Sequence, residues 1–192
     1  MRIVGGRFRG RSIASPAHDG VRPTSDRVRE SVFNILLHGI EGFAIDGVRV
    51  IDLFAGTGAL GLEALSRGAS YGLFVEEDAE SRGLIRQNVE ALGLTGSTRL
   101  FRRDATDLGP ASPMQPFGLA FLDPPYGKGL GERAISALRD GKWLTREAVV
   151  VWEERASSQL PWPDGFTEVD RRTWGDTQVA FGRYTATDHP AR

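Results

Sequence analysis

The pattern of apolar and polar positions predicts alternating strands and helices from residue 48 onwards. Short apolar runs, typical of buried parallel strands, lie at residues 48–54, 71–76, 98–101, 117–122 and 148–153. Apolar residues recur at helical spacing over residues 59–67, 79–92 and 130–143. Two last runs, at residues 166–173 and 177–184, predict an antiparallel pair. This order predicts an α/β fold with a doubly wound, mostly parallel sheet.

The segment before this pattern has a different character. Residues 1–22 are rich in Gly and Arg and predict an extended arm, with a hairpin around Gly5-Gly6. A helix is expected to follow, with Thr24 or Ser25 as its N-cap, and to end near His38. The sequence therefore predicts an N-terminal arm and helix over residues 1–42, a main domain over 43–185 and a frayed tail over 186–192.

The charge of the chain is balanced overall but unevenly distributed. The formal net charge is −1, whereas residues 1–30 hold seven arginines against three acidic residues. A local basic arm can bind phosphate groups even when the whole protein is neutral. A solvated surface explains the same pattern equally well, so charge alone leaves both interpretations open.

Residue composition excludes several kinds of chemistry. The 192 residues include no cysteine, which excludes disulfides, thiolate zinc sites, iron–sulfur clusters and a Cys nucleophile. The histidines His18, His38 and His189 are far apart and have no zinc spacing, so we predict no metal site. No apolar run is long enough to cross a bilayer, and the Arg-rich start lacks the apolar segment of a secretory signal. We expect no membrane partner.

A glycine-rich turn joins the first buried strand to the helix after it. Gly56, Gly58 and Gly61 have the G-x-G-x-x-G spacing of a nucleotide-binding turn, in which glycine lets the backbone approach a ligand closely. Glu76 ends the second strand, where a carboxylate can accept hydrogen bonds from two ribose hydroxyls. The turn therefore predicts a cofactor that contains a nucleoside.

Two features favour S-adenosylmethionine over a dinucleotide. The Asp52 carboxylate at the end of the first strand would repel a pyrophosphate but could hold the ammonium of a methionine group. Nothing downstream resembles a hydride-transfer site, and the terminal antiparallel pair favours the methyltransferase form of this architecture. Asp104, just after the third strand, could accept a hydrogen bond from the adenine amino group. The predicted cofactor-binding residues are Asp52, Phe54, Gly56, Thr57, Gly58, Glu76, Asp104 and Ala105.

The segment Asp123-Pro124-Pro125-Tyr126 follows the fourth strand and predicts the site of methyl transfer. Its two prolines lock the chain in an extended turn at the carboxyl edge of the sheet. The Asp123 carboxylate and the Pro124 carbonyl can accept both N–H groups of an exocyclic base amine. This frees the nitrogen lone pair and stabilises the charge that develops on nitrogen. Tyr126 can stack on the extruded base, so we predict Asp123, Pro124 and Tyr126 as catalytic residues.

Four segments together resemble the RsmD-type bacterial methyltransferases, which methylate a guanine 2-amino group in small-subunit (16S) ribosomal RNA. The segments are Arg2–Arg11, Arg22–Glu30, Asp52–Gly61 and Asp123–Tyr126, and the resemblance extends to about Tyr184. It implies a seven-stranded sheet of the Rossmann-like S-adenosylmethionine-dependent type. It also implies a cytoplasmic protein, which we expect to be a monomer, acting on a partly assembled small subunit.

The same resemblance implies that the N-terminal arm and helix contact RNA or cover the cofactor, and we predict RNA-binding roles for their basic residues. These are Arg7, Arg9, Arg11, Arg22, Arg27 and Arg29. As an alternative, Arg22, Arg27 and Arg29 are solvated helix residues, and Arg27 pairs with Glu30 or another neighbour. One departure from the family pattern is Arg103, which stands where a glycine is more usual before Asp104.

Two other functions remain open at this point. An adenine-N6 methyltransferase of DNA or RNA uses the same Asp-Pro-Pro-Tyr chemistry, although the chain has little spare length for the target-recognition region of a DNA enzyme. A non-catalytic RNA-binding assembly factor could keep the same fold. The presence of Asp52, Glu76 and Asp123 argues against that alternative, because binding RNA does not require these carboxylates.

Overall fold

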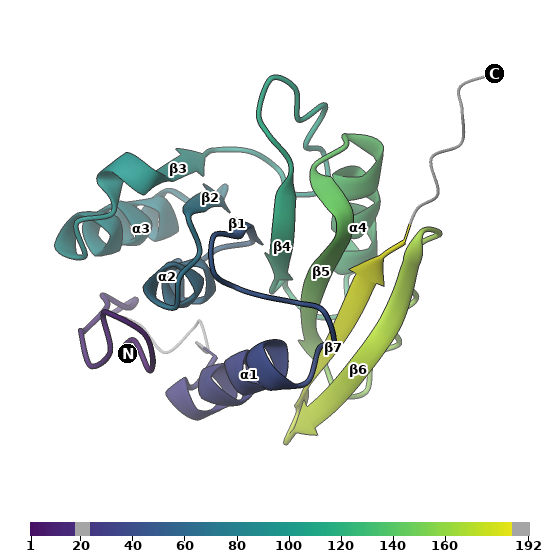
Figure 1. The fold of residues 1–192 in the computed structure, drawn as a ribbon, viewed down its shortest axis with the longest axis horizontal. Coiled ribbons are helices and arrows are strands. Elements are labelled where there is room, and N and C mark those ends of the chain that lie inside the picture. Colours follow the sequence, from purple (N-terminus) through teal and green to yellow (C-terminus); the bar gives the residue numbers. More distant parts are fainter. Residues whose placement is uncertain (18–23, 186–192) are drawn as a thin grey trace.

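The computed structural model describes residues 1–17 and 24–185, which contain a seven-stranded sheet in the order β3-β2-β1-β4-β5-β7-β6 (Figure 1). The strands are β1 (Arg49–Leu53), β2 (Tyr71–Val75), β3 (Thr98–Phe101), β4 (Phe117–Leu122), β5 (Leu144–Arg155), β6 (Phe166–Trp174) and β7 (Thr177–Tyr184). Strands β1 to β5 are parallel, and β7 pairs antiparallel with β5 and β6. The predicted sheet, including its terminal antiparallel pair, is confirmed.

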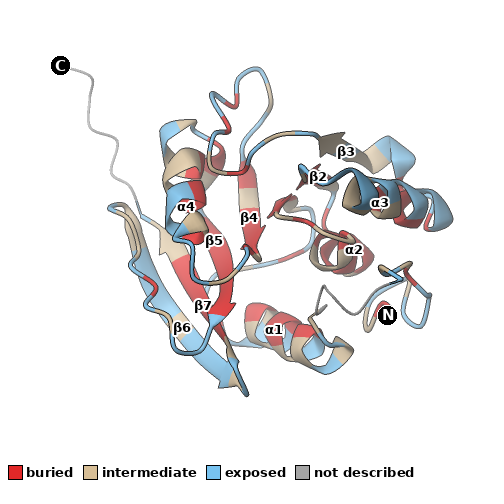
Figure 2. Ribbon diagram, turned by 180° about the vertical axis from the view of Figure 1, so that it is seen from behind, coloured by how far each residue is buried: buried red, intermediate tan, exposed pale blue. Residues whose placement is uncertain are grey.

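Helices cover both faces of this sheet (Figure 1). They are α1 (Asp26–His38), α2 (Ala59–Ser66), α3 (Ala79–Ala91), α4 (Leu130–Asp140) and the short 3-10 helix η1 (Thr95–Ser97). Side chains of α1, α2 and α3 belong to one hydrophobic cluster with one face of the sheet, and α4 belongs to a second cluster with the other face. Figure 2 shows the buried residues concentrated in the central strands, whereas β6 is largely exposed.

Alternation along the strands brings three carboxylates to the same face. Phe121 in β4 and Val151 in β5 belong to the cluster on the α1–α3 side. Because successive side chains of a strand point to opposite faces, Asp123 and Glu153, two residues further on, are directed to that side as well. Asp52 in β1 also faces it and reaches the backbone of α2. The three residues stand at the carboxyl ends of neighbouring strands.

The N-terminal arm folds back on itself and is fixed to α2. Arg2 and Ser12 form an antiparallel bridge, and the chain reverses between them, in the segment that contains the predicted hairpin residues Gly5-Gly6. The Glu63 carboxylate of α2 accepts hydrogen bonds from the backbone N–H groups of Val4 and Gly5, at 3.0 and 2.8 Å. The arm is therefore part of the folded structure before any ligand binds.

Helix α1 packs onto the sheet rather than standing apart from it. Its N-cap is Ser25, whose side chain accepts the backbone N–H of Val28 at 3.2 Å. Phe33 is fully buried, and its ring centroid lies 5.6 Å from that of Phe121. The N-terminal helix and the sheet thus share one hydrophobic core, and the predicted boundary near residue 42 does not separate two cores.

Two predicted boundaries were wrong. Helix α4 ends at Asp140 rather than at residue 143, because Gly141 caps it and Lys142 takes a positive φ of 59°. Strand β5 begins at Leu144 rather than at residue 148. Polar residues 145–147 concealed its start, and Glu147, with a φ of 65°, lies where the register with β4 shifts.

Two further points concern the ends of the chain and membranes. The predicted frayed tail, residues 186–192, lies outside the described residues. Among the residues that are described, no helix is long and apolar enough to span a bilayer.

Candidate active site

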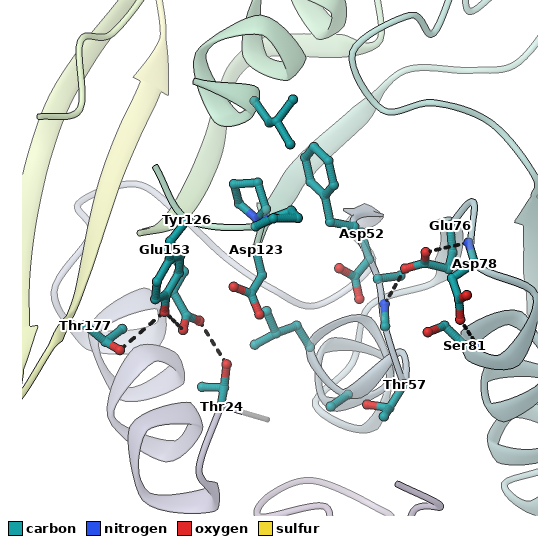
Figure 3. Close-up of a pocket in the computed structure, with 18 of the residues that line it drawn as sticks. Thr24, Asp52, Thr57, Glu76, Asp78, Ser81, Asp123, Tyr126, Glu153 and Thr177 are labelled. Atoms are coloured by element: carbon teal, nitrogen blue, oxygen red, sulfur yellow. Dashed lines mark hydrogen bonds between the residues drawn. The ribbon is translucent and has the colours of Figure 1, made fainter. Parts of the chain in front are cut away.

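A cavity of about 920 Å³ opens at the carboxyl ends of the parallel strands. It lies beside β1 and β4, between which the strand order reverses, and ligands of doubly wound folds bind at such a point. Figure 3 shows two ends of this cavity. Glu76 and Asp78 lie at one end, Glu153 and Tyr126 lie at the other, and Asp52 and Asp123 lie between them.

The glycine-rich turn is bent by residues with positive φ. Gly56 and Gly58 have φ angles of 58° and 79°, which glycine adopts without strain. Phe54 has a φ of 55°, and a non-glycine residue in this region costs about 1–3 kcal/mol. A Cβ added at Gly61 would lie 2.5 Å from Phe74 Cε1, so only glycine lets α2 pack this closely on β2. Phe54, Gly56 and Thr57 line the cavity, and Gly58 forms the N-cap of α2 behind them.

Asp52 is a buried carboxylate at the centre of the site. Its Oδ2 accepts the backbone N–H of Gly61 at 3.0 Å. Burial raises the pKa of the Asp52 carboxyl to about 8, the Gly61 bond lowers it, and the charge of Glu76 raises it further. Among the residues that the structure describes, none forms an ion pair with Asp52, so a bound cation would stabilise its ionised form.

Glu76 fixes the turn from the neighbouring strand. One carboxylate oxygen accepts the backbone N–H of Gly56 at 2.8 Å, and the other accepts that of Asp78 at 2.9 Å. Asp78 is in turn the N-cap of α3, where its side chain accepts the N–H of Ser81 at 2.8 Å. Each oxygen of Glu76 can accept a second hydrogen bond, and the residue lines the cavity. The ribose-binding role of Glu76 stays a prediction.

In the loop after β3, Thr106 rather than the predicted Ala105 lines the cavity together with Asp104. Asp104 lines the cavity and is exposed, and bonds from the backbone and hydroxyl of Thr106, at 2.8 and 2.7 Å, hold its pKa below the usual range. Thr106 also lines the cavity, whereas Ala105 is buried behind it. Arg103 donates to the Leu108 carbonyl at 2.8 Å, so its side chain is directed into its own loop.

Asp123 stands among other carboxylates. It lines the cavity with Pro124, and burial raises its pKa well above the usual range. The negative charges of Glu153, Asp52 and Glu154 raise that pKa further, in this order. The carboxylates of this part of the cavity suit a cationic ligand or a target that donates hydrogen bonds.

Tyr126 is held across the cavity by two hydroxyl contacts. Its phenol donates to Glu153 Oε1 at 3.1 Å and lies 3.3 Å from the Thr177 hydroxyl. Glu153 Oε2 accepts a hydrogen bond from the Thr24 hydroxyl at 2.9 Å. Burial raises the pKa of the Tyr126 phenol, so it is a neutral donor near neutral pH. The Asp-Pro-Pro-Tyr segment is thereby tied to β5 and to Thr24, which precedes the N-cap of α1.

Comparisons with known proteins agree with this geometry. A family model described as "Conserved hypothetical protein 95" matches residues 1–183. The chain is 41% identical over 162 residues to the ribosomal RNA small subunit methyltransferase D of Escherichia coli K12, covering 84% of this chain and 78% of the relative. It is 34% identical to the protein of the same name from Haemophilus influenzae, covering 91% of this chain and 89% of the relative.

The chain belongs to the ribosomal RNA small subunit methyltransferase D family. The solved structure of the Escherichia coli protein yhhF has the same fold, with a TM-score of 0.83 and 32% identity over 97% of this chain and 99% of that one. The family and the fold implied by the sequence resemblance are therefore confirmed.

The arginines expected to bind RNA in this family member do not share one environment. Arg7, Arg9, Arg11 and Arg27 are exposed, although Arg11 donates to the Ala91 carbonyl at 2.6 Å. Arg22 lies outside the described residues. The exposed residues keep their proposed role as phosphate contacts.

The prediction for Arg29 was wrong. Arg29 is fully buried and forms ion pairs with Asp26 at 2.9 Å and with Glu63 at 3.3 Å. Its guanidinium also donates to the Arg2 carbonyl. Because its charge is neutralised inside the protein, Arg29 joins the arm, α1 and α2 instead of meeting a phosphate. The helical spacing of Arg29 with Phe33 and Leu36, which are also buried, was a signal for this inward position.

Sequence reasoning missed two residues that this family member brings to the site. Glu153 is buried and lines the cavity, and its signal was a charged residue ending a buried strand beside β4. Asn88 in α3 donates to the Thr57 carbonyl at 3.0 Å and accepts the backbone N–H of Ala14 at 2.7 Å. Asn88 thus joins the arm to the glycine-rich turn, a contact that spans too much sequence for any local pattern to reveal.

Proposed function

We propose that this protein transfers a methyl group from S-adenosylmethionine to the exocyclic 2-amino group of a guanine in small-subunit (16S) ribosomal RNA. One observation carries the proposal: the glycine-rich cofactor turn and the Asp-Pro-Pro-Tyr segment open into one cavity, with Asp52 and Asp123 side by side at its centre. Membership of the methyltransferase D family supplies the class of RNA.

The residues of the cavity fit the proposed cofactor. S-adenosylmethionine carries a positive sulfonium and an ammonium group, and the cavity is lined by the carboxylates of Asp52, Glu76 and Asp123. Asp52 has the raised pKa of a carboxyl that lacks a cation, and the ammonium would supply one. Glu76 would hold the ribose, Asp104 the adenine amino group, and Phe54, Gly56 and Thr57 the surface beneath them. When bound, the cofactor supplies an electrophilic methyl group.

The chain's own residues prepare the acceptor nitrogen. The Asp123 carboxylate and the Pro124 carbonyl accept the two N–H groups of the guanine amine, which directs the lone pair of the nitrogen away from the ring. Because burial and neighbouring charges raise the pKa of Asp123, its carboxylate is also the natural acceptor for the proton released after methylation. The ring of Tyr126, fixed by its phenol, provides the stacking surface for the base.

The RNA-binding surface that we propose includes the basic arm. The exposed residues Arg7, Arg9, Arg11 and Arg27 are available for phosphates, and the arm is fixed to α2, the helix that follows the glycine-rich turn. We propose a cytoplasmic monomer that acts on the small ribosomal subunit or on an assembly intermediate of it.

The proposal is tested by transfer of labelled methyl groups to small subunits from a strain that lacks this modification, followed by digestion to nucleosides. Label in N2-methylguanosine is the expected result. Label in N6-methyladenosine would keep the chemistry but replace the substrate. Binding of S-adenosylmethionine and of the subunit without any transfer would support the non-catalytic assembly factor instead.

A further inference from the structure

Glu153 stands beside the proposed target amine, on the strand next to Asp123. Leu122 pairs with Trp152 in the parallel register of β4 and β5, so Asp123 and Glu153 are the next facing positions. Both side chains point to the α1 side of the sheet, and Figure 3 shows Glu153 next to Asp123, on the side away from Asp52. The charge of Glu153 is, after burial, the largest influence on the pKa of Asp123. The two carboxylates are therefore close neighbours in the target half of the cavity.

The Glu153 carboxylate is buried but still able to bind a ligand. Only 8% of the residue is exposed, and it lines the cavity. Oε1 and Oε2 each accept one hydrogen bond, from Tyr126 and Thr24, so each oxygen keeps a second lone pair. The pKa of Glu153 is raised, chiefly by burial and also by the charge of Glu154, although the bonds from Thr24 and Tyr126 lower it. Because both of these groups donate, both carboxylate oxygens act as acceptors in this arrangement. The side chain is held in one orientation by partners from two different segments.

Several described groups in this half of the cavity are hydrogen-bond acceptors, beside Arg155, whose guanidinium carbon lies 6.0 Å from the centroid of the Tyr126 ring. The acceptors are the Asp123 carboxylate, the Pro124 carbonyl and the Glu153 carboxylate, while the hydroxyls of Thr24 and Tyr126 already donate to Glu153. Guanine presents N–H donors at both N2 and the adjacent ring nitrogen N1. Adenine and cytosine instead carry a lone pair on the ring nitrogen next to their amino group. A carboxylate beside Asp123 would bind the guanine edge and repel the other two.

We propose that Glu153 is a specificity-determining residue, whose carboxylate accepts the N1–H of the target guanine while Asp123 and Pro124 hold its 2-amino group. This inference rests on the proposed function, because it assumes that the methylated base is a guanine. Enzymes that extrude a base read its Watson–Crick edge by such hydrogen bonds. A site that is built to pair with a donor also rejects analogues that lack it.

The test replaces one base and one side chain. The target guanine, located by the labelling experiment, is exchanged for 2-aminopurine by ligation of synthetic RNA before the small subunit is reconstituted. 2-Aminopurine keeps the 2-amino group but has a lone pair at N1. Single-turnover transfer to the two substrates is compared for the wild type, for Glu153→Gln and for the control Thr24→Val. The control removes one donor to Glu153 but leaves its carboxylate in place.

The wild type should prefer guanine by about 10- to 100-fold, the discrimination expected of one good base contact. Glu153→Gln should reduce this preference at least about tenfold, because its amide N–H₂ can donate to the N1 of 2-aminopurine. Thr24→Val should lower both rates and leave their ratio within about twofold, since the carboxylate remains.

An equal preference for guanine in the wild type and in Glu153→Gln would overturn the inference. The role of Glu153 would then be limited to orienting Tyr126 through their hydrogen bond. Label in guanine together with such an unchanged ratio would still support the proposed function. Absence of guanine labelling by the wild type would overturn the proposed function, and this inference with it.

Discussion

The Tyr126 phenol donates a hydrogen bond of 3.1 Å to the carboxylate of Glu153, which accepts a second bond from Thr24. These hydrogen bonds join the Asp-Pro-Pro-Tyr segment to the carboxyl end of β5 and to the segment that precedes α1. The tyrosine ring therefore keeps one orientation in the cavity, and the orientation depends on a residue that lies far away in sequence.

Two substitutions of Tyr126 distinguish the contribution of its aromatic ring from that of its hydroxyl group. Tyr126→Ala should lower single-turnover methyl transfer by about 10- to 100-fold, because a stacked base is worth about 1–3 kcal/mol. Tyr126→Phe keeps the stacking surface and should lower transfer less than about tenfold, since it loses one hydrogen bond. If the two variants were equally impaired, the hydroxyl group rather than the ring would account for the role of Tyr126.

The raised pKa of Asp52 makes a prediction about stability. The folded carboxyl has a pKa of about 8, well above that of an unfolded aspartate, so the folded state holds the proton more tightly. The contribution of Asp52 to stability is therefore present at low pH and is lost as pH rises from about 4 to 8. Asp52→Asn keeps an acceptor for the Gly61 N–H and carries no charge.

In the absence of cofactor, Asp52→Asn should melt above the wild type at pH 8.5, by at least about 2 °C, and by a clearly smaller margin at pH 5. The same variant should bind S-adenosylmethionine more weakly, because it cannot balance the ammonium charge. Thermal unfolding at both pH values and calorimetric titration of the cofactor provide the measurements. A variant that is less stable than the wild type at pH 8.5 would contradict the account of Asp52.

The buried carboxylate of Glu63 is expected to matter for stability rather than chemistry. It pairs with Arg29 at 3.3 Å and Arg67 at 2.9 Å and accepts two backbone N–H groups of the arm. Glu63→Ala leaves the charge of Arg29 buried without this partner, which costs about 3–5 kcal/mol. Denaturant unfolding measures this loss, and limited proteolysis should cut the released arm.

A matched control comes from α3. Glu90→Ala removes an exposed glutamate from the last turn of a helix and should change the free energy of unfolding by less than about 0.5 kcal/mol. If Glu63→Ala and Glu90→Ala changed the free energy of unfolding equally, the bonds of Glu63 would not be what holds the arm in place.

The arginines of the arm should act through phosphates. Arg7→Ala and Arg9→Ala should each weaken subunit binding and reduce the slope of log affinity against log salt by about one. Arg146→Ala is the control, because this exposed arginine lies near the amino end of β5, opposite the cavity. Filter binding over a salt series measures both quantities, and unchanged slopes in the arm variants would remove these residues from the RNA surface.

The features predicted correctly from the sequence are those that depend on local patterns of residues. Apolar runs identified the strands, and the glycines and prolines identified the two turns, because their backbone geometry depends on nearby residues alone. Residues Asp52, Glu76 and Asp123 could be placed since they end buried parallel strands, whose carboxyl ends meet at one edge. The sequence therefore predicted residues that line both halves of the cavity, and their chemical roles stay a prediction.

What it did not predict depends on contacts between distant segments. Arg29 and Arg27 differ little in local sequence, yet Glu63 and the arm bury the first and leave the second exposed. The role of Glu153 depends on Thr24 and Tyr126, which reach it from two other parts of the fold. The start of β5 was missed for another reason: its first residues pair irregularly with β4, so their polar pattern does not resemble a strand.

The most direct test of the central claim compares the wild type with Asp123→Ala in one assay on unmethylated small subunits. Methyl transfer and subunit binding are measured in parallel, together with binding of S-adenosylmethionine. The account predicts that the substitution lowers transfer by at least about 100-fold, the loss expected when one stabilising group at the reacting atoms is removed. Affinity for the subunit should remain within about twofold, because phosphate contacts supply it. Transfer at the wild-type rate by Asp123→Ala would contradict the account.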